Sequence, residues 1–173
     1  EFFNHQMVEI ENGNFGDTIV RSFLHDSFNF LFYTQLSSSK DETLAALAAK
    51  SLKEVKYHLR HSKNWLIRLG DGTEKSNKKV QEGLNNIWQF TDELFEMDKV
   101  DDELLKNGIG VNNTDLKNKW NEIVNTTLQK AKLNRPDDAY MATGGKKGMH
   151  TEYLGFILTE MQFLQRAYPN AKW

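Results

Sequence analysis

Cysteine is absent from this chain of 173 residues, which excludes disulfide bonds, thiolate catalysis and cysteine-ligated metal sites together. Proline occurs only twice, at Pro136 and Pro169, and both lie outside the segments with apolar periodicity, so long helices are permitted. The sequence has no signal-peptide pattern and no apolar run long enough to cross a membrane. These absences predict a soluble, cytoplasmic protein.

The sequence also lacks a strong excess of positive or negative charge. Lysine and arginine total 22 against 24 for aspartate and glutamate, a formal net charge of -2. Such a balance argues against nucleic acid or an anionic membrane as the main partner. The chain begins at Glu1 instead of methionine, with Phe2 and Phe3 directly after it, and we therefore expect the protein to have a further N-terminal portion.

Apolar residues recur at steps of three and four along most of the chain, which is the pattern of amphipathic helices. The clearest stripe follows Asp41, an N-capping residue, and ends at the Gly70-Asp71-Gly72 stop. No segment of useful length alternates with the period of a strand. The sequence predicts an all-α fold, a single long-helix bundle domain over residues 1–173, with helices near 17–36, 41–69, 73–95, 114–133 and 150–168.

Three side chains that can bind a metal lie on or beside the stripe of the second predicted helix. Glu54, His58 and His61 stand at i, i+4 and i+7, so they could form a ligand row or a buried hydrogen-bonded cluster. Carboxylate-bridged di-iron bundles carry Glu-x-x-His on each of two helices. Here position i+3 is Tyr57, and Glu-x-x-His occurs nowhere in the chain, so the hydrogen-bonded cluster is favoured.

Asp26 is the fourth member of this predicted cluster. It lies in the middle of a predicted helix that is apolar around most of its surface, where an unpaired carboxylate is costly. Pairing with His58, or with a cation of the next helix, would satisfy it. A structural pairing is favoured over a ligand role.

A glycine- and lysine-rich loop precedes the last predicted helix. The loop residues are Gly144, Gly145, Lys146, Lys147 and Gly148. Glycines allow close backbone approach, lysines supply charge, and a helix start offers free N–H groups, so the loop could contact phosphate, including that of coenzyme A. It does not match a Walker A motif. The alternative is a basic, flexible connection.

Several motifs together resemble one family. They are Asn12-Gly-Asn-Phe-Gly-Asp-Thr-Ile-Val-Arg21, the run from Ala48 to Arg60, Arg68-Leu-Gly-Asp-Gly-Thr73, Gly144-Gly-Lys-Lys-Gly-Met-His-Thr-Glu-Tyr-Leu-Gly155 and Glu160-Met-Gln-Phe-Leu-Gln-Arg166. In this order they resemble the C subunits of multicomponent ring 1,2-phenylacetyl-CoA epoxidases, proteins of phenylacetate catabolism. The resemblance covers essentially the whole chain.

The resemblance implies a ferritin-like helical bundle that begins about two helices earlier than Glu1. It also implies a structural, non-catalytic subunit without a metal of its own. The implied partners are a homologous catalytic subunit, which carries the di-iron centre and binds phenylacetyl-CoA, and further subunits that include a reductase. On this interpretation Asp26, Glu54, His58 and His61 are the remnant of a ligand row. The alternative function is an autonomous ferritin-like, metal-dependent oxidase that uses these four residues.

Overall fold

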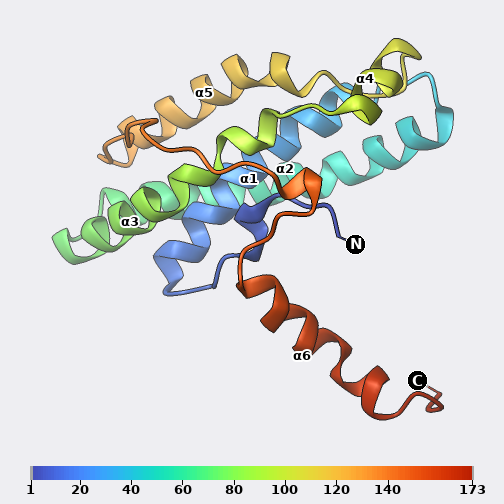
Figure 1. Cartoon of the computed structure of the whole chain (residues 1–173). Helices are drawn as coiled ribbons and strands as arrows, with labels where there is room; N and C mark the ends of the chain where they lie inside the picture. Colours follow the sequence, from blue (N-terminus) through green and yellow to red (C-terminus); the bar gives the residue numbers. More distant parts are fainter. Residues whose placement is uncertain (1, 173) are drawn as a thin grey trace.

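The computed structural model describes residues 2–172, and every regular element in this range is helical. The α-helices are α1 (Phe15–Leu36), α2 (Glu42–Gly70), α3 (Glu74–Ile87), α4 (Lys99–Lys106), α5 (Asn113–Lys130) and α6 (Tyr153–Ala167). Four short 3-10 helices join them: η1 (Gln6–Glu9), η2 (Trp88–Phe90), η3 (Asp92–Phe95) and η4 (Gly145–Lys147). The predicted all-α bundle is therefore confirmed. The arrangement is shown in Figure 1.

Helix α1 is the central element of the bundle and contacts α2, α3 and α5. Its first turn is closed by a capping box between Asn14 and Asp17, which satisfies N–H groups that have no partner inside the helix. A loop of five residues, 37–41, then turns the chain, and α2 runs back along α1 (Figure 1). The Asp41 side chain accepts from the Leu44 N–H, as the sequence indicated.

The helix bounds differ most from the prediction in the third helix. Sequence periodicity predicted a helix over 73–95, but α3 ends at Ile87 and the chain continues as η2 and η3. These two tight turns place Glu93, Leu94 and Phe95 inside the molecule. The other four predicted helices start and end within three residues of the observed ones.

The core is rich in aromatic and branched side chains. The rings of Trp88 and Trp120 lie 5.9 Å apart, and Phe95 meets Trp120 edge to face at 5.4 Å. The Trp120 N–H donates to the Leu24 carbonyl at 3.0 Å, which ties α5 to α1. This acceptor matters because a buried indole N–H without a hydrogen-bond partner lowers stability.

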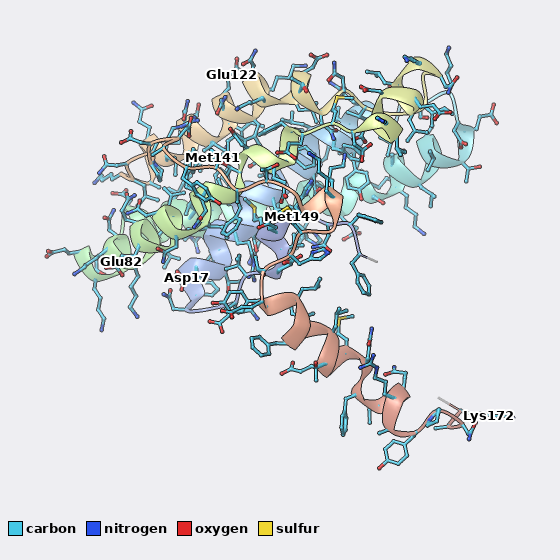
Figure 2. The ribbon with its side chains drawn as sticks, in the orientation of Figure 1. Asp17, Glu82, Glu122, Met141, Met149 and Lys172 are labelled. Carbon is cyan, nitrogen blue, oxygen red and sulfur yellow. The ribbon has the colours of Figure 1, made fainter. Side chains whose placement is uncertain are left out.

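Helix α6 leaves this body. Figure 1 shows it pointing away from the other helices toward the C-terminus, and the labelled Lys172 in Figure 2 lies at its far end. It has no buried residue, and it contacts the body mainly through η1. No helix among residues 2–172 is both long enough and apolar enough to cross a membrane.

Candidate functional site

The predicted polar row on α2 faces outward. Glu54, His58 and His61 are all exposed, so the expectation that they form a buried cluster is wrong. The buried stripe of α2 consists of Ala48, Val55, Ser62, Leu66 and Gly70. Glu54 and His61 each precede a member of this stripe by one residue, and one residue is a rotation of about 100° on an α-helix. Both therefore lie on the flank of α2.

Asp26 is only half-buried, and its partner is a hydroxyl group. The Ser62 hydroxyl donates to Asp26 Oδ2 at 2.8 Å and also to the His58 carbonyl at 3.0 Å. Burial raises the pKa of Asp26 above its usual value, against the lowering effects of the Ser62 hydrogen bond and of the nearby His58 and His61. The sequence placed Asp26 opposite α2 correctly but missed Ser62 as its partner.

The four residues of the predicted row, Asp26, Glu54, His58 and His61, are not gathered around one point. Asp26, His58 and His61 line a shallow groove of about 370 Å³ between α1 and α2, whereas Glu54 does not line it. Among residues 2–172, no three histidine, aspartate or glutamate side chains are arranged so that they could hold a metal ion. The donors of the four-residue row therefore do not fit the di-iron centre of a ferritin-like oxidase, which needs carboxylates that converge from several helices.

The glycine-lysine loop wraps around the carboxylate of Glu93, a side chain of the same chain. Gly144 and Gly148 adopt positive φ angles of 110° and 78°, which turn the chain tightly. The Gly145 N–H donates to Glu93 Oε1 at 2.5 Å, and the Gln6 N–H donates to Glu93 Oε2 at 2.6 Å. Glu93 is fully buried. The sequence indicated that this loop could bind an anion, and in the structure the Gly145 N–H of the loop binds the carboxylate of Glu93.

The two lysines of the loop have different environments. Lys146 is half-buried and forms an ion pair with Asp101 of α4. Lys147 is exposed and forms no ion pair with any described residue. The loop therefore fastens the chain to η3 and α4, and Lys147 is the one lysine of the pair whose side chain is not already engaged.

A second buried carboxylate, Glu9, holds the start of the last helix. Glu9 accepts from His150 Nδ1 at 2.6 Å, from the Thr151 N–H at 2.7 Å, from the Thr151 hydroxyl at 2.8 Å and from Asn4 at 2.7 Å. Burial acts to raise the pKa of Glu9, but these hydrogen bonds outweigh it and leave the pKa below its usual value. Sequence reasoning did not single out Glu9 or Glu93.

His150, just before α6, contacts the N-terminal segment at two points. Its Nε2 faces the Phe2 carbonyl at 2.9 Å, while its Nδ1 faces Glu9. Both ring nitrogens of His150 therefore face oxygen atoms of the N-terminal segment. We call the contacts of Glu9 and Glu93 with 4–6 and 145–151 the carboxylate clasp.

Two further histidines, His5 and His25, pack together beside the clasp. Their rings are 6.1 Å apart, and His25 Nδ1 lies 3.0 Å from the Asn29 amide nitrogen. Burial lowers the pKa of His25 to about 4, with smaller lowering effects from His5 and Arg21. Burial, followed by the charge of Lys146, also lowers the pKa of His5. This pair is therefore neutral in the folded protein at neutral pH.

Comparison with known proteins agrees with the resemblance seen in the sequence. The chain matches the family described as phenylacetic acid catabolic protein over residues 1–173. It is 46% identical, over all 173 of its residues, to the C subunit of the 1,2-phenylacetyl-CoA epoxidase of Escherichia coli (strain K12), and the match covers 70% of that protein. The chain therefore belongs to the phenylacetic acid catabolic protein family.

Proposed function

We propose that this chain is a structural subunit of a phenylacetyl-CoA epoxidase complex that acts in aerobic phenylacetate catabolism in the cytoplasm. The observation that carries the proposal is the 46% identity along the whole chain to a protein named as the C subunit of that enzyme. Its partners in the proposal are a homologous catalytic subunit with a di-iron centre and the remaining subunits, including the reductase.

The placement of the polar side chains supports a structural and not a catalytic role. Glu54, His58 and His61 are exposed and do not converge, and Asp26 is engaged by Ser62. The two fully buried carboxylates, Glu9 and Glu93, are saturated with hydrogen bonds from the chain itself. In the proposal the di-iron centre supplies the oxygen chemistry from the partner, and this chain carries no cofactor.

Helix α6 supports membership of a larger assembly. Its exposed apolar side chains include Phe156, Met161 and Phe163, each more than 60% exposed. A 15-residue helix that buries nothing is marginal in water by itself. Large apolar side chains exposed on one helix are consistent with an interaction site.

A contact between the glycine-lysine loop and the phosphates of coenzyme A stays a prediction. Gly145 and Lys146 are engaged by Glu93 and Asp101, so Lys147 is the side chain that would make it. Replacing Lys147 with alanine should then weaken coenzyme A ester binding by the complex at low salt and have less effect at high salt. Unchanged affinity at low salt would remove the idea.

The proposal is tested by producing the chain with and without the other subunits of its epoxidase and measuring iron and epoxidase activity. We expect a stable complex whose iron follows the catalytic subunit, and no stoichiometric iron in this chain alone. His58→Ala should leave the iron content of the complex unchanged, because His58 is exposed and belongs to no ligand set. Stoichiometric iron with oxidase activity in the isolated chain would refute the structural role.

A further inference from the structure

The exposed side of α2 carries a concentration of positive charge that the composition of the whole chain conceals. From Lys50 to Arg68 the sequence contains six lysine and arginine residues and one acid, Glu54, although the protein has a net charge of -2. The cations are Lys50, Lys53, Lys56, Arg60, Lys63 and Arg68. All of them lie outside the buried stripe of α2. We call this set the basic face.

No side chain of the basic face forms an ion pair with any carboxylate in residues 2–172, since all ion pairs of that range lie elsewhere. Both arginines of the basic face lie over aromatic rings of α2. The Arg60 guanidinium is 5.5 Å from the centre of the Tyr57 ring, and that of Arg68 is 5.6 Å from the Trp65 ring. Tyrosine, tryptophan and arginine are the residue types enriched at the energetic centres of protein interfaces.

The surface around these residues is hollowed. One hollow of about 480 Å³ is lined by Lys56, Arg60 and Lys63 together with the apolar Phe30 and Leu59. A second, of about 230 Å³, is lined by Tyr57, Arg60, His61, Asn64, Trp65 and Arg68. Both combine cations with apolar or aromatic walls, so each can receive a side chain that is partly apolar and ends in a carboxylate.

The length of the basic face favours a helix over a phosphate group as its partner. Lys50 and Arg68 are 18 positions apart on one helix, which is about 27 Å along its axis at 1.5 Å per residue. A bound phosphate group would call for a compact cluster of cations, whereas these cations are spread over five turns. A row of this length matches a second helix that carries carboxylates at regular intervals.

We propose that the basic face of α2 is a docking surface for an acidic, amphipathic helix of the partner subunit. The inference rests on the proposed function, since the occupant belongs to the same complex. The carboxylates of that helix pair with the lysines and arginines of the face. Its apolar side chains enter the two hollows beside Tyr57 and Leu59.

The test compares two triple variants in the complex formed with the homologous catalytic subunit. In the first, Lys53, Lys56 and Arg60 of the basic face become glutamate. In the matched control, the exposed Lys75, Lys78 and Lys79 of α3 become glutamate, which changes the net charge equally. Helix content and thermal unfolding check the fold, and a version with glutamine at the three α2 positions retains helix propensity if the first variant unfolds.

We expect the α2 variant to weaken binding of the partner subunit about tenfold or more at 50 mM NaCl, and less at 300 mM, while the α3 variant changes it less than about twofold. Tyr57→Ala should weaken binding at both salt concentrations, because it removes apolar contact.

Three outcomes overturn the inference. If the wild-type chain binds the partner and the α2 and α3 variants behave alike, the inference fails while the proposed function stands. If the wild-type chain does not bind the partner at all, the proposed function fails and takes the inference with it. If the α2 variant instead abolishes self-association of the isolated chain or binding of free coenzyme A, the occupant is a second copy or that ligand, and not an acidic helix of the partner.

Discussion

Replacing Gly145 with alanine tests the carboxylate clasp directly. A Cβ atom at this position would lie 2.7 Å from Glu93 Oε1, and it would lie deep inside van der Waals contact with the backbone carbonyl oxygen of Asn4. One of these two atoms is backbone and the other is a fully buried carboxylate, so neither gives way easily. The loop must therefore move away from the N-terminal segment and from η3.

The cost has two parts. Overpacking of a tight site typically costs about 1 to 3 kcal/mol. Moving the loop also breaks the 2.5 Å hydrogen bond from the Gly145 N–H to Glu93, and a hydrogen bond to a charged group contributes about 1.5 to 3 kcal/mol. Since one movement relieves the overlap and breaks the bond, the two parts are not additive. We expect a loss of about 3 kcal/mol in the free energy of unfolding, or about 6 to 12 °C in Tm for a chain of this size.

Two other glycines in the same part of the chain serve as controls, and denaturant unfolding of all three variants is the assay. Gly148 has a positive φ, but an added Cβ would approach nothing closer than 3.9 Å, so Gly148→Ala measures backbone strain alone, about 1 kcal/mol. Gly155 lies in α6 with no atom within 4 Å of an added Cβ. Gly155→Ala should leave stability unchanged or raise it by up to about 1 kcal/mol.

The test is the order in which the three substitutions lower the free energy of unfolding. The clasp requires that Gly145→Ala be the most destabilising and Gly155→Ala the least. A loss at Gly145 no larger than the loss at Gly148 would refute the clasp, because steric overlap with Asn4 and Glu93 would then contribute nothing. A change in the denaturant m-value of the Gly145 variant alone would show that the substitution alters the compactness of the native or the denatured state, or that unfolding is no longer two-state.

Three further predictions concern ionisable groups. The free energy of unfolding should fall by up to about 3 kcal/mol as the pH is lowered from about 6.5 to about 4. Over this range the unfolded chain binds a proton at His25, whereas burial keeps the pKa of His25 in the folded protein near 4. A free energy of unfolding that does not change over this range in denaturant experiments would contradict the burial of His25. Asp26→Asn should leave stability at pH 7 unchanged or raise it, because burial disfavours the carboxylate and the amide still accepts from Ser62; a clear loss in thermal unfolding would show a partner for the charge. Lys146→Ala should cost about 1 kcal/mol and Lys147→Ala less than about 0.5 kcal/mol in denaturant unfolding, and equal losses would contradict the ion pair assigned to Lys146.

The helices of this protein are predictable because their signals are local. The stripe through Ala48, Val55 and Leu66 and the cap at Asp41 lie within one segment, so sequence spacing alone defines α2 and its buried face. The break after Ile87 is not predictable in this way. The apolar spacing continues past it, and the two 3-10 turns are determined by tertiary packing that takes Glu93 inward.

The candidate site is harder to predict because its contacts are distant in sequence. Glu93 meets Gln6, 87 positions away, and Glu9 meets Thr151, 142 positions away. Neither glutamate has a local pattern that distinguishes it from a surface residue. The one usable signal was the glycine-lysine run at 144–148, which indicated an anion but could not indicate that the anion would be a side chain of the same chain.

The exposure of α6 has a consequence for the amount of this protein in a cell. A copy that has not yet met its partners exposes Phe156 and Phe163 on a helix with no buried residue, and exposed segments with few buried contacts are preferred sites of proteolysis. Assembly that covers the helix would remove this exposure. We therefore expect the cellular level of the protein to follow the supply of its partners, with cleavage of surplus copies beginning at α6.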